Sequence, residues 1–136
     1  MALSKLAVET RFMPALEQAA LVRDKKVSAL ELLDAAIERY EAYNPKINAV
    51  NIVWLEHARE LAKRDDATRD ATSGKSAPFR SVPTLFKDLH TTYAGQRISN
   101  GNKALKNAGY IATRNTVMVD RYLGAGFVPF GRTNSC

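Results

Sequence analysis

Two adjacent charged residues, Lys87 and Asp88, end an apolar run at a point where proteins often place chemistry. The run, Val82–Phe86, has the length of a buried strand and stops abruptly at this pair. Ligand crevices of α/β proteins lie beyond the carboxyl ends of such strands. Burial there disfavours a charged ammonium group, and an uncharged lysine can act as a general base. On these residues alone, a charged turn after a strand is the simpler interpretation.

The other residues that could take part in binding or catalysis give weaker evidence for a site. Ser73–Ser76 ends like a phosphate-binding loop, but that motif requires a glycine where this chain has Arg69, so we expect a solvated loop. His57 is expected on a helix surface, and His90 is a candidate to line a cleft. Cys136 is the single cysteine and lacks neighbours that would support a nucleophile. No His, Cys, Asp or Glu spacing resembles a ligand set, so we expect no metal and no cofactor.

The composition is that of an ordinary globular protein, with 46% apolar and 25% charged residues. No apolar run approaches the ~20 residues that span a bilayer, so we expect a cytoplasmic protein without a membrane partner. Residues 1–73 carry 11 Lys or Arg and 12 Asp or Glu, whereas residues 74–136 carry 9 and 2. Residues 74–136 are therefore basic, but apolar residues separate their cations, and we do not expect nucleic acid as a partner.

The first part, residues 1–68, has the periodicity of helices. We expect helices over residues 14–25, 28–44 and 54–63, with a short connector at residues 47–53. Ser28 and Glu31 have the spacing of a capping box at the start of the second helix. Asn44-Pro45 is expected to end that helix, because the residue before a proline avoids the helical conformation. Trp54 is expected in the core.

The second part, residues 69–136, follows a polar loop over residues 65–79 and changes pattern. We expect a strand at residues 82–86 and then a glycine-rich excursion at residues 91–113, with one helical turn at residues 103–107. A helix at residues 114–123 and a second strand at residues 127–130 are expected to follow. This order is typical of an α/β protein with a mainly parallel sheet. Two strands do not make a stable sheet. We therefore interpret the chain as one incomplete domain and expect exposed apolar area around Phe86, Phe127 and Phe130.

Five segments of the chain resemble, in order, motifs of the amidase signature family. Phe79–Asp88 is similar to its L-x-G-V-P-x-x-x-K-D segment, and Ala125–Asn134 to its A-G-A-x-x-x-G-[KR]-T-N strand and turn. Three further segments resemble its amino-terminal helices, its N-P-x-I-N-A-V connector and its G-x-x-T-T-x-G-S loop, at residues 27–32, 44–50 and 95–102. The K-D-L form and the connector look most similar to the branch of linear-amide and cyclic-dimer amide hydrolases.

This resemblance implies a fold and a chemistry. The fold is α/β, with amino-terminal helices followed by the first strands of a mainly parallel mixed sheet. Members of the family hydrolyse carboxamides through a Ser–Ser–Lys triad, in which the lysine acts on a bridging serine and an acyl-enzyme forms. Lys87 matches the catalytic lysine and Asp88 the next position, for which a structural role is expected. Thr133 and Asn134 match residues near the active-site floor, so Lys87 is expected to be buried in a cleft beside them.

Three positions depart from the family pattern. Ser81 and Asn102 stand where the family usually has glycine and serine, and Cys136 stands where it approaches a P-E pair. The segment that holds both catalytic serines has no counterpart in these 136 residues. We therefore expect an inactive amino-terminal fragment whose partners are a small-molecule amide and the remainder of an amidase chain, with a homodimer left open. The alternatives are a glutamine amidotransferase subunit, a non-catalytic helical or basic interaction module, and a truncated reading frame without activity.

Overall fold

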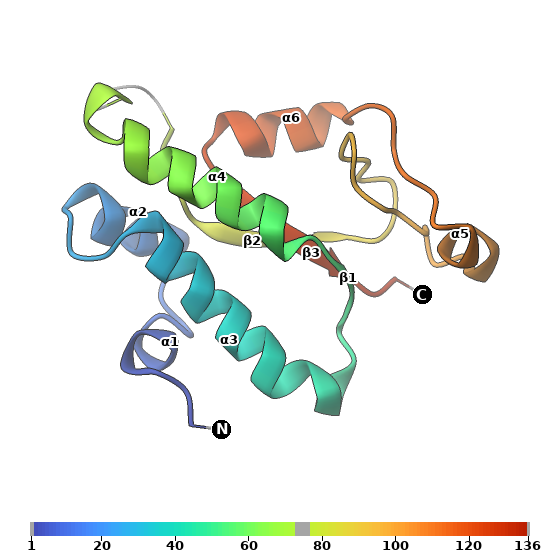
Figure 1. The fold of residues 1–136 in the computed structure, drawn as a ribbon, viewed down its shortest axis with the longest axis horizontal. Helices are drawn as coiled ribbons and strands as arrows, with labels where there is room; N and C mark the ends of the chain where they lie inside the picture. The colour runs from blue at the N-terminus through green and yellow to red at the C-terminus, as the bar shows by residue number, and fades with distance from the viewer. Residues whose placement is uncertain (1, 73–76, 136) are drawn as a thin grey trace.

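The computed structural model describes residues 2–72 and 77–135, which form helices around a few short strands (Figure 1). The elements in chain order are α1 (Lys5–Glu9), α2 (Ala15–Arg23), α3 (Ala29–Ile47), β1 (Val50–Val53), α4 (Leu55–Thr68), the 3-10 turn η1 (Asp70–Thr72), β2 (Pro83–Lys87), α5 (Lys103–Ala108), α6 (Val117–Gly124) and β3 (Val128–Thr133). The predicted α/β class is confirmed.

The three strands form one mixed sheet in the order β1-β3-β2. β3 pairs in parallel with β2 and antiparallel with β1. The strands that we predicted at residues 82–86 and 127–130 are confirmed as β2 and β3. β1 is an addition, because the segment that we expected to be a connector contributes Val50, Ile52 and Val53 as β-branched partners for the second edge of β3.

Helices α3, α4 and α6 pack with the strands in one hydrophobic core. Phe86 and Phe130 are only 3% and 5% exposed, so the prediction of exposed apolar area around them was wrong. The reason is the position of α6, whose Tyr122 ring lies 5.8 Å from the ring of Phe86. Phe127 is half-buried and stacks on Phe79 at 4.7 Å.

The long helix α3 begins as predicted and ends later than predicted. Glu31 N–H donates to the Ser28 hydroxyl at 3.0 Å, and Ser28 N–H donates to the Glu31 carboxylate at 2.7 Å, which confirms the capping box. The helix continues through Pro45, because a proline in the last turn removes only one helical hydrogen bond. Asn48 then closes it with φ 48°, and its N–H donates to the carbonyl of Asn44 at 2.7 Å.

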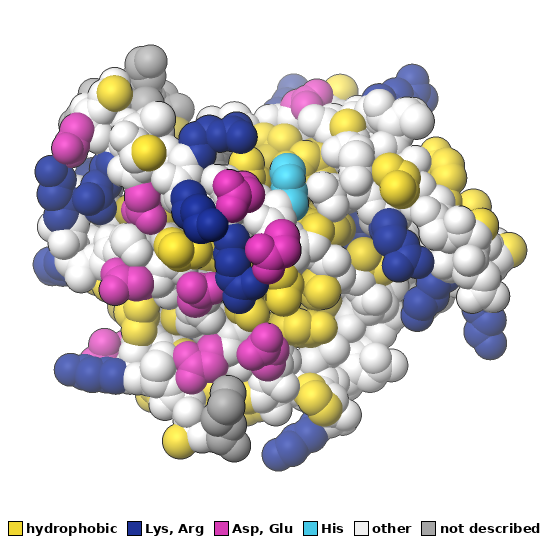
Figure 2. Space-filling view, in the orientation of Figure 1, with side chains coloured by type: hydrophobic (Ala, Val, Ile, Leu, Met, Phe, Trp, Pro, Cys, Tyr) yellow, Lys and Arg dark blue, Asp and Glu magenta, His cyan; other side chains and the backbone are white. Residues whose placement is uncertain are grey.

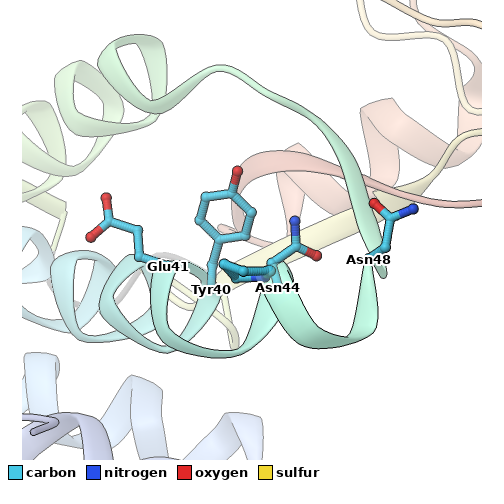
Figure 3. Close-up of a pocket in the computed structure, with 5 residues that line it drawn as sticks. Tyr40, Glu41, Asn44 and Asn48 are labelled. Carbon is cyan, nitrogen blue, oxygen red and sulfur yellow. The ribbon is translucent and has the colours of Figure 1, made fainter. Parts of the chain in front are cut away.

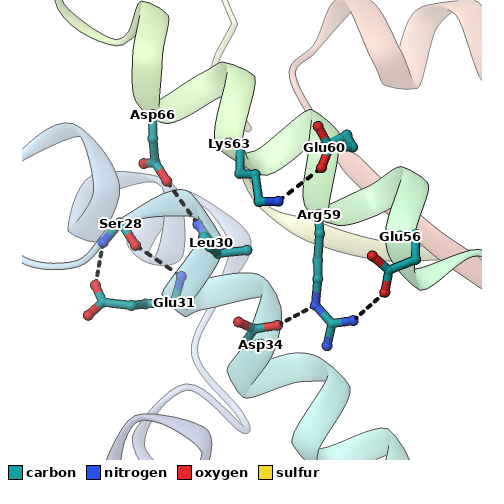
Figure 4. A network of polar contacts seen from close by, with 9 residues as sticks. All are labelled: Ser28, Leu30, Glu31, Asp34, Glu56, Arg59, Glu60, Lys63 and Asp66. Carbon is teal, nitrogen blue, oxygen red and sulfur yellow. Dashed lines mark hydrogen bonds and ion pairs between the residues drawn. The ribbon is translucent and has the colours of Figure 1, made fainter.

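Polar contacts join α3 to α4 (Figure 4). Helix α4 also continues beyond its predicted end at residue 63. Asp66 on α4 accepts hydrogen bonds from the N–H groups of Ala29 and Leu30 at 2.7 and 3.1 Å, so it caps the start of α3. Asp65 accepts a hydrogen bond from the Ser81 hydroxyl at 2.9 Å. The segment that we predicted to start a loop at residue 65 is therefore helical through Thr68, because tertiary contacts hold its polar side chains.

The surface over α3 and α4 carries acidic and basic side chains side by side (Figure 2). Arg59 on α4 bridges Asp34 on α3 and Glu56 on its own helix, each at 3.1 Å. Lys63 and Glu60 pair at 2.9 Å. Exposed pairs of this kind contribute little stability individually, and the mixed signs do not make a basic stripe on this face.

Candidate active site

The predicted base, Lys87, is the last residue of β2 and pairs with Thr133 of β3 in the sheet register. Its side chain is exposed rather than buried as expected. Phe86 points into the core, so the alternation of a strand directs Lys87 to the opposite face. Within residues 2–72 and 77–135 the Lys87 amine makes no hydrogen bond or ion pair.

Asp88, the next residue, is fully buried at 0% exposure. Its carboxylate accepts hydrogen bonds from the Ser99 N–H at 2.8 Å, the Ser99 hydroxyl, the Asn51 side-chain amide at 2.8 Å and the Asn100 N–H at 3.3 Å. Burial alone would raise the pKa of Asp88, but these hydrogen bonds together outweigh burial and lower the pKa below its ordinary value. Asp88 is therefore ionised at neutral pH and ties the glycine-rich excursion to the end of β2.

A buried cation, Arg132, lies on β3 beside this site and was missed by the sequence analysis. Its Nε donates to the carbonyl of Arg97 at 2.7 Å, and its Nη1 donates to the carbonyl and hydroxyl of Thr91 at 2.6 and 2.8 Å. Nη1 also lies 3.4 Å from the carbonyl of Lys87. The guanidinium lies 5.2 Å from the centre of the Trp54 ring, within the range of a cation–π contact.

The charge and position of Arg132 follow from its strand. Burial lowers the pKa of Arg132 to about 10, and the negative charge of Asp88 opposes part of that change. We interpreted residues 131–134 as a turn, whereas β3 continues to Thr133. The alternation set by the buried side chains of Val128 and Phe130 places Arg132 on the same inward face. The direction of the Arg132 side chain could be predicted from that alternation, whereas its hydrogen-bond partners could not.

Thr133 and Asn134 lie at the same end of the sheet but make different contacts. The Thr133 hydroxyl lies 3.5 Å from the carbonyl of Phe86, so it faces β2. Asn134 is exposed; its N–H donates to the carbonyl of Ala49 at 2.7 Å, and its side-chain amide donates to the carbonyl of Asn48. The structure thus brings Thr133 together with Lys87, whereas the Asn134 side chain is bound to the segment before β1.

The two histidines lie in different surroundings. His57 is half-buried, and its Nε2 lies 2.7 Å from the Tyr93 hydroxyl, so it is not on a free helix surface as expected. Burial lowers the pKa of His57, and the positive charge of Arg64 lowers it further. His90 is exposed, with φ 56°, and its backbone N–H donates to the Asn100 side chain at 3.0 Å. Neither histidine contacts Lys87.

A hollow of about 410 Å³ lies at the carboxyl end of α3 (Figure 3). Its lining consists of Tyr40, Glu41, Asn44, Pro45 and Asn48. None of the predicted site residues lines this hollow. The lining contains no lysine, serine or histidine, so it does not match the predicted chemistry.

Ser73–Ser76 and Cys136 lie outside the residues that the structure describes. In the described part of the chain, no group of three His, Cys, Asp or Glu side chains is placed to hold a metal ion. A membrane-spanning helix is likewise absent from residues 2–72 and 77–135, because none is both long and apolar enough.

Comparisons with known proteins bear on this arrangement. The Amidase family model matches residues 31–136. A 6-aminohexanoate-cyclic-dimer hydrolase of Paenarthrobacter ureafaciens is 40% identical over 121 residues, which cover 87% of this chain and 22% of that protein. An acylamidase of Rhodococcus erythropolis is 39% identical over 127 residues, which cover 91% of this chain and 25% of that protein.

The fold comparison agrees with the sequence comparison. A solved structure of 6-aminohexanoate cyclic dimer hydrolase matches with a TM-score of 0.79 and 36% identity, covering 97% of this chain and 24% of that one. The chain therefore spans about a quarter or less of the length of these relatives. Since the family model covers most of the chain and the fold agrees, this chain belongs to the amidase signature family.

Proposed function

We propose that this chain supplies the general base, Lys87, of an amide hydrolase that cleaves carboxamide C–N bonds. The observation that carries the proposal is that the Lys87 side chain is accessible and, within the described part of the chain, unoccupied. The Lys87 amine is exposed at the end of a strand whose next residue is fully buried, and it has no partner among the described residues. Because no carboxylate of the described residues occupies this amine, a serine hydroxyl can come within hydrogen-bond reach of it, and a general base requires that reach.

In the proposed reaction, the Lys87 amine accepts a proton from a bridging serine as that serine takes the proton of a second, nucleophilic serine. The second serine oxygen attacks the amide carbonyl, and the proton returns to the nitrogen as the C–N bond breaks. Water then hydrolyses the resulting ester, which releases the acid and frees the serine. We propose that both serines lie in polypeptide outside these 136 residues and that the chain acts together with that polypeptide.

The substrate that we propose is a small linear or cyclic amide. A cyclic-dimer hydrolase and an acylamidase are both about 40% identical to this chain, and this similarity supports the proposal. The amidotransferase alternative uses the same lysine chemistry on glutamine, so substrate choice separates the two functions.

A chimera tests the proposal. Residues 1–136 replace the equivalent segment of the Paenarthrobacter ureafaciens hydrolase. Opening of the cyclic dimer of 6-aminohexanoate, which frees one amine for each amide bond hydrolysed, is measured by amine detection. We expect turnover by the chimera and none by the 136-residue chain alone, because the chain alone lacks the nucleophile.

Two outcomes of the same assay would contradict the proposed function. A chimera that folds, as judged by circular dichroism, and yet hydrolyses neither the cyclic dimer nor simple anilides would overturn the proposal. Release of ammonia from glutamine, without hydrolysis of the other amides, would replace the hydrolase with the amidotransferase.

A further inference from the structure

The carbonyl of Lys87 is held by Arg132 through Thr91. Nη1 of Arg132 donates to the Thr91 hydroxyl at 2.8 Å, and this hydroxyl in turn donates to the carbonyl of Lys87. The same Nη1 makes a longer contact of 3.4 Å with that carbonyl directly. Because Arg132 is 0% and Thr91 5% exposed, water competes little for these bonds.

The other polar atom of the same peptide group is also held. The carbonyl of Lys87 and the N–H of Asp88 belong to one planar peptide unit, and that N–H donates to the carbonyl of Thr133 at 2.9 Å. The Asp88 carboxylate is fixed in turn by the Ser99 N–H at 2.8 Å. The peptide that follows Lys87 is therefore bound at both ends, whereas the lysine side chain is free to reach outward.

Burial of the Arg132 charge has a cost. The guanidinium is buried and forms no ion pair with the described residues, and its Nη2 is buried without a hydrogen-bond partner. A buried donor left unpaired destabilises a protein, and an apolar side chain would remove that penalty but would also leave the carbonyls of Arg97 and Thr91 without this donor. Buried charges occur at functional sites as well as in structural networks, so the contacts between Arg132 and the Lys87 backbone decide the role inferred here.

We propose that Arg132 is a positioning residue for Lys87: it fixes the backbone from which the catalytic amine extends. Thr91 transmits this effect, and Asp88 completes it from the other side. A displaced base loses rate steeply, because proton transfer depends on a hydrogen-bond distance. This inference rests on the proposed function, since it assigns Arg132 an effect that acts only through Lys87.

A double-mutant cycle in the active chimera tests the inference. We expect Arg132→Met to lower kcat by about 10-fold to 100-fold with KM nearly unchanged. Arg132→Lys should recover part of that loss, because its ammonium can still donate to the carbonyls around Thr91. In the Lys87→Ala background, Arg132→Met should lower the residual kcat no further, since the residue that it positions is already gone.

Two controls and one substitute variant keep the test decisive. Arg59→Met removes an arginine of the same size from the α3–α4 surface, and Leu32→Ala destabilises the core away from the site; both should keep kcat at a temperature where the variants are folded. If Arg132→Met does not fold, Thr91→Val removes the hydroxyl that binds the Lys87 carbonyl and should lower kcat in the same way.

The outcomes separate this inference from the proposed function. Full activity of Lys87→Ala would overturn the proposed function itself. Loss of activity in Lys87→Ala, combined with an unchanged kcat in Arg132→Met or Thr91→Val, would overturn the positioning role alone. A loss from Arg132→Met that is equally large with and without Lys87 would also overturn it, because that is the signature of a general structural effect.

Discussion

At the scale of single residues, the burial of His57 beside Tyr93 makes the stability of the fold depend on pH. The two side chains lie 2.7 Å apart, and the Tyr93 ring also packs edge-on against Trp54 at 5.9 Å. Burial lowers the pKa of His57 from its ordinary value of 6.5. The folded state therefore holds His57 neutral where the unfolded state begins to protonate it.

The expected result is a loss of stability on acidification. The contribution of His57 is fully present above pH 6.5 and is lost as the pH falls through the window between 6.5 and the lower folded-state value. Urea unfolding of the 136-residue chain at a series of pH values from neutral downward measures this loss. His57→Gln should flatten the dependence, and His90→Asn should leave it as in the wild type. An equally steep dependence in His57→Gln would contradict the assignment.

Residue-level prediction worked where neighbours in the chain carry the signal. The position of Lys87 at the end of a strand followed from the apolar run before it, and the capping box of Ser28 followed from its spacing. The prediction that Lys87 is buried was wrong, because side chains alternate between the two faces of a strand and Phe86 points inward. Arg132 was missed because its hydrogen-bond partners come from the excursion, at sequence separations that no local pattern reports.

At the scale of elements, the turn between α6 and β3 sets the alignment of the two parallel strands. Gly126 has φ +99°, and a Cβ atom there would lie 2.5 Å from the Cα of Arg80. Its carbonyl accepts a hydrogen bond from the N–H of Ser81 at 2.8 Å. The close approach of these two backbones brings the start of β3 beside the start of β2, and only glycine allows it.

Alanine at this position should therefore be severely destabilising. Gly126→Ala combines an unfavourable φ with a backbone clash, and we expect a loss of about 2–4 kcal/mol in the free energy of unfolding. Gly95→Ala is the matched control, because Gly95 also has positive φ, +82°, but no atom lies within 4 Å of its missing Cβ. We expect about 1–2 kcal/mol for that control. Equal losses in urea unfolding would show that the contact with Arg80 does not matter.

Element types were easier to predict than element ends. The periodic segments were found as helices and the apolar runs as strands, but α3 continues through Pro45 and α4 continues to Thr68. In the second case Asp66 binds the start of α3 across a separation of 37 residues from Ala29. Such contacts between distant segments override local preference, which is why the polar composition after residue 64 indicated a loop.

At the scale of the whole molecule, the core and the Lys87 amine lie on opposite sides of the sheet. α3, α4 and α6 pack with the inward side chains of the strands, whereas Lys87 points away from them. The core contains residues from both parts of the chain, Leu32 among the first and Phe130 among the second. The expected boundary near residue 68 stays a prediction about sequence pattern, since the hydrophobic core crosses it.

The same arrangement explains how the chain fits the proposed function. The helices stabilise one face, and the end of β2 presents the Lys87 amine on a backbone held by Asp88 and Arg132. The polypeptide that bears the serines would then approach the face of the sheet that carries this amine. Because the chain spans 22% of its cyclic-dimer relative, that approach is part of the proposal.

The assignment of Lys87 is tested most directly by the turnover number of the Lys87→Ala chimera on the cyclic dimer. The control is Lys63→Ala, which removes a surface lysine that pairs with Glu60. If Lys87 is the base, kcat falls by about 10²–10⁴-fold in Lys87→Ala and stays unchanged in Lys63→Ala, with both proteins folded. Equal turnover by the two variants would contradict the assignment of Lys87 as the base.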